Sequence, residues 1–95
     1  RGVLILAVLS ELRAEHYGYS LRKNLSAKGL EIDEGTLYPL VRRLEKQELL
    51  ISEWRMENNR KKRFYQLSSV GKEVLKSLTK DWQETEATLN NILEQ

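Results

Sequence analysis

The side chains best able to bind a polyanion lie in two short basic segments of this chain. The first holds Arg42, Arg43 and Lys46, and the second is the run at residues 60–63. A guanidinium group can pair bidentately with guanine O6 and N7 or with phosphate, whereas an ammonium group binds phosphate as a point charge. Arg43 taken alone is equally well explained as solvated surface charge. The two segments together predict that the partner is double-stranded DNA.

A helix beginning near Asp33 would place the first basic segment on its outer face. An advance of about 100° per residue gathers the apolar side chains of this segment into one sector, which must face a core. These apolar residues are Leu37, Leu40, Val41 and Leu44. The outer side carries Thr36, Tyr38, Arg42, Arg43 and Lys46. Thr36 lies near the helix start, where backbone N–H groups and side chains both reach phosphate or base edges.

The second basic segment falls beside a predicted β-hairpin. Strands are predicted at about 50–56 and 62–67, and the asparagines at 58 and 59 between them supply turn chemistry. The hairpin would therefore hold three cations near its tip, namely Arg60, Lys61 and Lys62. A helix that can enter a groove, followed by a cationic hairpin, is typical of a winged helix-turn-helix.

Three further helices complete the predicted fold. The first spans about residues 2–14 and is apolar almost all round. The second spans about 18–28 and ends at Gly29, a residue type that favours a left-handed C-cap. The last spans about 69–93 and has Ser68 as its N-cap. The predicted fold class is therefore mainly α with a small two-stranded wing.

The last helix carries an apolar stripe that predicts a homodimer. Its stripe residues follow the alternating spacing of a coiled-coil seam and are Leu75, Leu78, Trp82, Thr85, Leu89 and Ile92. A helix of about 25 residues is about 37 Å long, more than a globule of this size can cover. The expected dimer interface includes the first helix and consists of Val3, Leu6, Leu75, Leu78, Trp82, Leu89 and Ile92. Packing against the first helix of the same chain is the alternative.

Domain organisation and charge distribution support the same arrangement. Residues 1–68 would form the winged helix-turn-helix domain, whose first helix also joins the dimer interface, and residues 69–95 the C-terminal dimerisation helix. Residues 1–80 hold sixteen basic and ten acidic side chains, a balance of +6, whereas residues 81–95 hold four acids and no base. Such a distribution suits a basic body on DNA and an acidic tail that points away from it.

Four short strings of residues carry a family resemblance. They are Gly35-Thr36-Leu37-Tyr38-Pro39-Leu40, Arg43-Leu44-Glu45-Lys46, Phe64-Tyr65-Gln66-Leu67-Ser68 with Gly71, and Gly18-Tyr19-Ser20-Leu21. With these strings, residues 3–82 resemble the PadR-type transcriptional regulators. The resemblance implies a homodimeric bacterial repressor with a roughly palindromic operator and a C-terminal helix that makes the dimer. It also implies which residues approach the operator: Tyr19, Thr36, Tyr38 and Arg43, with Arg60 to Lys62 at the wing tip.

Two positions depart from that family pattern. Many members have glycine where this chain has Glu48, after the third helix, where a left-handed C-cap is often needed. A non-glycine residue in that conformation costs roughly 1 kcal/mol. Lys61 replaces a common proline, which makes the wing more basic and less stiff.

The two tryptophans have different expected roles. Trp54 and Tyr65 can face each other across the wing, which is most simply sheet packing. Trp82 lies on the dimer stripe, where two copies could sandwich a flat aromatic ligand by offset stacking. Some members of the resembled family sense aromatic or drug-like compounds near their dimer interface, so a small aromatic effector is an expected partner. The alternative is that Trp82 is plain interface core.

Little in the sequence points to an enzyme. The chain has no cysteine, and its one histidine, His16, has no other metal ligand at suitable spacing, so neither a metal site nor a cofactor is predicted. The apolar run at residues 3–9 is far shorter than the ~20 residues that cross a bilayer, and a cytoplasmic protein is expected. Two other interpretations remain: a winged-helix module that docks an acidic protein, and an aromatic-compound-binding protein without affinity for DNA.

Overall fold

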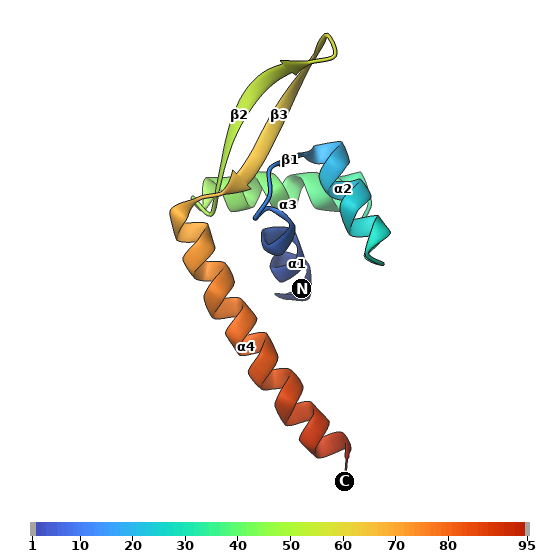
Figure 1. Cartoon of the computed structure of the whole chain (residues 1–95), viewed down its shortest axis with the longest axis vertical. Helices are drawn as coiled ribbons and strands as arrows, with labels where there is room; N and C mark the ends of the chain where they lie inside the picture. The colour runs from blue at the N-terminus through green and yellow to red at the C-terminus, as the bar shows by residue number, and fades with distance from the viewer. Residues whose placement is uncertain (1, 95) are drawn as a thin grey trace.

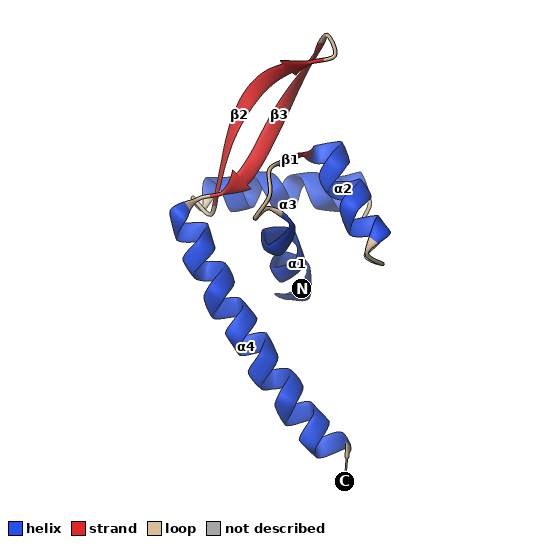
Figure 2. Ribbon diagram, in the orientation of Figure 1, coloured by secondary structure: helices blue, strands red, loops and turns tan. Residues whose placement is uncertain are grey.

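The computed structural model describes residues 2–94. Its elements, in chain order, are α1 (Gly2–Glu11), β1 (His16–Tyr17), α2 (Gly18–Ala27), α3 (Glu34–Lys46), β2 (Leu50–Glu57), β3 (Arg60–Leu67) and α4 (Ser69–Leu93). Three helices form a body, the β2–β3 hairpin extends from it on one side, and α4 runs away in the opposite direction (Figure 1, Figure 2). The prediction of a mainly helical chain with a wing and a long C-terminal helix is confirmed.

The sheet contains one more strand than the sequence predicted. β1 pairs antiparallel with β3, which gives the strand order β1-β3-β2. Only His16 and Tyr17 form β1, and a strand of two residues has no alternation to reveal it in the sequence. The first helix is correspondingly shorter than predicted and ends at Glu11. Because α2 follows β1 directly, this pairing joins the wing to the start of α2.

Leucines and valines of the three body helices form most of the core. The least exposed leucines of the core are Leu9, Leu21, Leu37 and Leu44, together with Leu12, which directly follows α1. The apolar face predicted for α3 is confirmed by the burial of Leu37, Leu40, Val41 and Leu44. Removing apolar surface from water stabilises the fold by roughly 25 cal/mol per Å², so this face holds α3 against the rest of the body. The opposite face of α3 is left in solvent.

The β2–β3 hairpin is longer, and its turn tighter, than predicted. Glu57 pairs with Arg60, so the turn consists of Asn58 and Asn59 alone. Their φ values of 53° and 63° are left-handed, as a two-residue type I′ turn requires and as asparagine tolerates. Residues 60–62 therefore form the first part of β3, directly after the turn. In a strand, their side chains alternate between the two faces of the hairpin.

Left-handed residues follow α2 and α3, as the sequence predicted. Gly29 has a φ of 99°, and Glu48 has a φ of 66°. After Glu48, the Leu49 amide donates to the Leu44 carbonyl at 3.0 Å, which is the characteristic bond of a Schellman motif. This chain therefore keeps the left-handed helix end although it lacks glycine there.

A hydrogen-bonded junction fixes the start of α4 to the end of α3. The Ser68 hydroxyl accepts from the Gly71 amide at 2.9 Å and donates to the Glu48 carbonyl at 2.6 Å, which confirms Ser68 as the N-cap. A Cβ at Gly71 would lie 2.0 Å from the Leu49 carbonyl oxygen, so a side chain there would overlap the backbone. This junction sets the direction in which α4 leaves the body.

The two ends of α4 have different surroundings. The beginning of α4 packs against α1, and Leu75 is 7 % exposed in the core of the same subunit. Leu78 packs partly against that core. Residues 81–94 are all exposed, and α4 extends well beyond the body (Figure 1). Packing within one chain thus covers only the beginning of the predicted stripe, and Leu75, predicted at a dimer interface, is already covered within the subunit.

Candidate nucleic-acid interface

The outer face of α3 presents cations without acidic partners. Arg42, Arg43 and Lys46 are exposed and together line one surface depression. Within residues 2–94, none of the three forms an ion pair with a carboxylate. Unpaired surface charges of one sign attract ligands of the opposite sign. The structure therefore brings these three predicted residues together on one accessible face.

Thr36 is exposed at the start of α3, where the sequence predicted it. Its hydroxyl donates to the Asp33 carboxylate at 2.9 Å. Asp33 is the N-cap of α3, but its side chain accepts no hydrogen bond from the helix backbone. Its carboxylate instead holds the Thr36 hydroxyl at the exposed end of the helix.

The start of α2 lies directly against α3. The Tyr38 ring covers Gly18 so closely that a Cβ at Gly18 would be 2.9 Å from the ring carbon Cε1. Tyr38 is consequently half-buried, whereas Tyr19 is 50 % exposed. The charged groups of Arg22 and Lys23 lie 5.9 and 5.6 Å from the centre of the Tyr19 ring. Neither cation is among the predicted site residues, although a spacing of three and four residues places both beside Tyr19 on one helix face.

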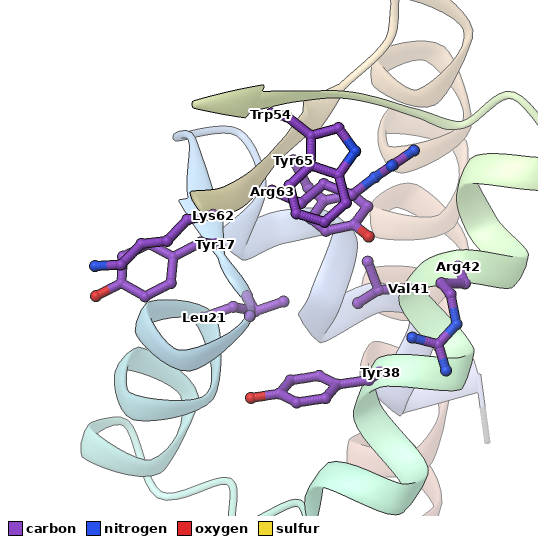
Figure 3. A pocket seen from close by; sticks show the side chains of 10 residues that line it. Tyr17, Leu21, Tyr38, Val41, Arg42, Trp54, Lys62, Arg63 and Tyr65 are labelled. Atoms are coloured by element: carbon purple, nitrogen blue, oxygen red, sulfur yellow. The ribbon is translucent and has the colours of Figure 1, made fainter. Parts of the chain in front are cut away.

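A cavity of about 230 Å³ separates the wing from the start of α2 and the outer face of α3. Its lining includes four aromatic rings and three cations, namely Tyr17, Tyr38, Trp54, Tyr65, Arg42, Lys62 and Arg63 (Figure 3). Burial raises the pKa of the Tyr65 phenol above its ordinary value, and the nearby Arg63 charge opposes that effect. Aromatic and cationic groups of α3 and the wing converge on this concave surface.

One face of the hairpin borders the cavity and is here named the cavity face. Strand alternation and register give it Ser52, Trp54, Met56, Lys61, Arg63 and Tyr65. The charged groups of Lys61 and Arg63 each lie 5.3 Å from the Trp54 ring. Trp54 shares this face with Tyr65, as predicted, but it is 54 % exposed, so sheet packing alone does not account for it. The alternation of aromatic and basic residues across the hairpin was the signal that could have identified Trp54.

A polar cluster ties the cavity face to α3. The Arg63 Nε donates to the Ser52 hydroxyl at 2.9 Å, and an Arg63 terminal nitrogen lies 3.2 Å from the Glu45 carboxylate. The Ser52 hydroxyl donates to the same carboxylate. The Arg63 guanidinium group therefore already has partners within the fold. Arg60 and Lys61 are exposed and form no ion pair in the described part of the chain.

The opposite face of the hairpin, here named the paired face, carries Arg55, Arg60 and Lys62, and two of these cations, Arg55 and Lys62, form ion pairs. Lys62 also lines the cavity. Lys62 Nζ lies 3.2 Å from Glu57 and 4.2 Å from the centre of the Tyr17 ring. Arg55 pairs with Glu15 beside β1. The hydrogen bond that Lys62 donates to Glu57 raises the pKa of Lys62, and the hydrogen bond that Arg55 donates to Glu15 raises the pKa of Arg55. Lys62 was predicted to bind DNA but already has partners in the folded chain.

The residues predicted for a dimer interface lie on α1 in the body and on α4, which runs away from the wing (Figure 1). Four of them are exposed in the single chain, namely Val3, Trp82, Leu89 and Ile92. Leu6 and Leu78 are partly buried against the core. One subunit therefore leaves these four apolar side chains uncovered.

His16 supports the start of α2. Its Nδ1 lies 3.1 Å from the Ser20 hydroxyl oxygen, which also accepts from the Tyr17 amide at 3.1 Å. Within residues 2–94, no three His, Cys, Asp or Glu side chains are grouped as metal ligands would be. Over the same residues, no helix has both the length and the apolar character that crossing a membrane requires.

Comparisons with known proteins agree with this geometry. The profile of the transcriptional regulator PadR-like family matches residues 5–77. The structure is similar to that of a PadR family transcriptional regulator from Eggerthella lenta, with a TM-score of 0.91, 40 % identity, and coverage of 99 % of this chain and 84 % of that one. A PadR-like transcriptional regulator from Bacillus cereus is similar with a TM-score of 0.90, 30 % identity, and coverage of 99 % and 94 %.

A curated relative gives the same result from sequence. A transcriptional regulator of Mycobacterium tuberculosis is 39 % identical over 61 residues, which are 64 % of this chain and 57 % of that protein. The family profile includes the whole of α3 and of the wing. This chain belongs to the PadR-like family of transcriptional regulators.

Proposed function

We propose that this chain is a sequence-specific transcriptional repressor that binds a palindromic operator as a homodimer. The observation that carries the proposal is the group of unpaired cations on α3, namely Arg42, Arg43 and Lys46. They lie beside a wing that is tied to α3 through Glu45 and Arg63. A helix and a wing fixed in this way can contact adjacent parts of one duplex at the same time.

The proposed complex places α3 in the major groove and the wing along the neighbouring backbone or minor groove. Thr36 and Arg43 reach base edges, because they lie on the exposed side of α3, whereas Arg42 and Lys46 bind phosphate. Tyr19 and Tyr38 approach the backbone from the start of α2 and the first half of α3. Arg60 and Lys61 extend the cationic surface along the wing.

The proposed homodimer forms through α4 and α1. Residues 81–94 are exposed in the single chain, and they include the stripe residues Trp82, Leu89 and Ile92. A long helix with an uncovered apolar stripe is best stabilised by a second copy of itself. Two-fold symmetry then sets the two α3 helices on half-sites about one helical turn (~34 Å), or a multiple of it, apart. A palindromic operator follows from this symmetry.

The proposal includes release by a small aromatic effector at the dimer interface. Trp82 is exposed on the stripe, where its symmetry mate would be the nearest large aromatic side chain. A planar ring held between the two indoles would change the distance between the two α3 helices. Such an effector must bind the free dimer more tightly than the DNA-bound dimer, because equal affinities shift no equilibrium.

Selection of bound sequences from random duplex DNA tests the proposed function. We expect enrichment of one palindromic sequence, and a log affinity that falls linearly with log salt by roughly 0.9 per phosphate neutralised. Binding without sequence enrichment would contradict a sequence-specific repressor. Absence of salt-dependent binding to any duplex would contradict DNA binding itself.

A further inference from the structure

Glu45 is the only acidic residue in the last two turns of α3, and it lies between Arg43 and Lys46 in the sequence. An Arg63 terminal nitrogen donates to its two carboxylate oxygens at 3.2 and 3.3 Å, and the Ser52 hydroxyl donates to the same carboxylate. Within residues 2–94, no other side chain of α3 forms a hydrogen bond or an ion pair with the β2–β3 hairpin. Glu45 is therefore the polar link between this helix and the wing.

The link lies part of the way along the hairpin and not at its base. Ser52 is the third residue of β2, and Arg63 pairs with Trp54, which is two residues further toward the turn. The base of the hairpin is already fixed, because only residues 47–49 connect α3 to β2. A bond beyond that base resists rotation of the hairpin about it. The Glu45 carboxylate therefore sets the angle between the wing and α3.

Folding stability alone does not account for this ion pair. The side chains of Arg63 and Glu45 are 37 % and 26 % exposed, and ion pairs with this much exposure contribute little to stability. Their effect on a bound polyanion is larger, because Arg42 and Arg43 lie within one helical turn of Glu45. A free carboxylate there would repel phosphate, and a free Arg63 would attract the phosphate of any duplex. The ion pair removes both effects.

We propose that Glu45 determines the specificity of DNA binding by fixing the wing at one angle to α3 and by keeping Arg63 away from the phosphate backbone. This inference rests on the proposed DNA-binding function and adds the residue that limits binding to random sequence. Phosphate contacts carry no sequence information, so an arginine withheld from phosphate weakens binding to every duplex. A wing at a fixed angle loses less conformational freedom on the operator than a mobile wing does. Glu45 is a positioning residue, because it acts through Arg63 and Ser52.

Glu45→Ala tests the withheld charge. The affinity for random duplex should increase, and the log–log salt slope should become steeper by about one unit for each arginine released onto a phosphate. Operator affinity should not rise with it, so the ratio of operator affinity to random affinity should fall about tenfold. A residue that only stabilises the fold would weaken binding to both DNAs and would not make the slope steeper.

Glu48→Ala is the matched control. Glu48 follows the same helix, is exposed, and forms no ion pair within residues 2–94. Removal of its carboxylate changes the net charge by the same amount but releases no arginine, so the salt slope and the affinity ratio should remain those of the wild type. An equally steeper slope in both variants, or an unchanged slope in Glu45→Ala, would overturn the proposal.

A double substitution separates the release of Arg63 from a general change of charge. In an Arg63→Ala protein, a further Glu45→Ala should leave the salt slope unchanged, because no arginine remains to be released. If the slope becomes steeper in this background by as much as it does in the wild type, the carboxylate acts on DNA directly. That result would overturn the role given to Arg63.

A measurement without DNA tests the wing angle by itself. The Arg63 guanidinium lies 5.3 Å from the centre of the Trp54 ring, so Trp54 reports on this part of the wing. In a Trp82→Phe protein, Trp54 is the sole indole, and Glu45→Ala should lower its fluorescence anisotropy. Unchanged anisotropy would overturn the link between Glu45 and the wing, whether or not the protein binds DNA. A wild-type protein that binds no duplex would overturn the proposed function and, with it, the role of Glu45 in specificity.

Discussion

At the scale of single residues, cations of the same type differ in what they can bind. Lys62 and Arg63 are held by Glu57 and Glu45 within the fold, and transfer of either cation to a phosphate would break an existing ion pair. Arg43 has no such pair in the described chain, so the only cost of binding a new partner is the desolvation of its guanidinium group. The cations without internal partners are therefore the better candidates for base and phosphate contacts.

Replacement of Arg43 should alter which sequences are preferred. We expect Arg43→Ala to weaken operator binding by about 1–3 kcal/mol and to relax base preference at one position of each half-site. Lys76→Ala, which removes an exposed cation from α4, should change neither property. Competition between operator variants measures both effects. An unchanged preference in Arg43→Ala would show that Arg43 does not read a base.

The left-handed turn after α3 predicts a stabilising substitution. Glu48 has a φ of 66°, a conformation that costs a non-glycine residue roughly 1–2 kcal/mol. Glycine avoids this cost, but it loses more conformational entropy on folding, which destabilises the fold by roughly 0.5–1 kcal/mol. Glu48→Gly should therefore raise the free energy of unfolding by about 0.5–1 kcal/mol. Gln47→Gly should lower it, because Gln47 has a φ of −81°. Urea unfolding distinguishes the two, and a loss of stability in both variants would contradict the strain argument.

At the scale of elements, α3 and α4 keep a fixed orientation because one side-chain hydroxyl and a few backbone groups join them. The Ser68 hydroxyl connects Glu48, at the end of α3, to Gly71, in the first turn of α4. Leu49 packs its carbonyl against Gly71. In the proposed dimer, the orientation of α4 relative to α3 would set the distance between the two α3 helices. This junction would therefore affect DNA binding as well as local stability.

A side chain at Gly71 should disrupt that junction. Its Cβ would lie 2.0 Å from the Leu49 carbonyl oxygen, so α4 must shift or the helix start must unwind. We expect Gly71→Ala to lower the free energy of unfolding by about 1–3 kcal/mol, the range found for overpacking. Gly2→Ala, with nothing within 4 Å of the new Cβ, is the control and should not destabilise. If thermal and urea unfolding show the same stability for Gly71→Ala as for the wild type, the close approach between Gly71 and the Leu49 carbonyl is absent in solution.

At the scale of the whole molecule, the body alone leaves much of α4 uncovered. The molecule measures 58 × 26 × 20 Å, and its long dimension reflects the wing at one end and α4 at the other (Figure 1). Exposed apolar residues on α4 include Leu89 and Ile92, whereas Leu75 is already in the core. Substitutions at the buried start of the α4 stripe should therefore affect folding, whereas substitutions at its exposed end should affect only dimerisation.

Leu89→Asp should prevent dimerisation without unfolding the subunit. Leu89 is exposed in the single chain, so the new charge is costly only where a partner would desolvate it. Sedimentation should show a dimer for the wild type and for Asn91→Asp, a monomer for Leu89→Asp, and unfolded chain for Leu75→Asp. Operator binding should collapse in Leu89→Asp. A wild-type protein that sediments as a monomer at micromolar concentration would contradict the dimer.

An aromatic effector should quench Trp82 in the assembled dimer. In a Trp54→Phe protein, Trp82 is the sole indole, and we expect about one planar ligand per dimer, because one symmetric slot admits one ring system. Trp82→Ala should abolish ligand binding and leave a weakened dimer. Unchanged fluorescence across a broad panel of aromatic compounds, or binding that survives Trp82→Ala, would leave Trp82 as interface core.

The sequence by itself determined the features that depend on neighbouring residues. The spacing of Leu37, Leu40, Val41 and Leu44 gives α3 its inner face and hence its basic outer face. Asparagine at the hairpin turn and Ser68 at the start of α4 act through their own backbone or the next few residues. Such features follow from helical and strand periodicity and from local hydrogen bonding, so they can be read without the fold.

Only the tertiary structure decided which of the predicted site residues are available. Lys61 and Lys62 are adjacent and chemically identical, yet strand alternation puts one beside Trp54 and the other between Glu57 and Tyr17. Similarly, Leu75 belongs to one stripe with Leu89 but is buried within the subunit. These outcomes depend on pairing register and on contacts between segments far apart in the chain, because burial and ion pairing arise only where such segments meet.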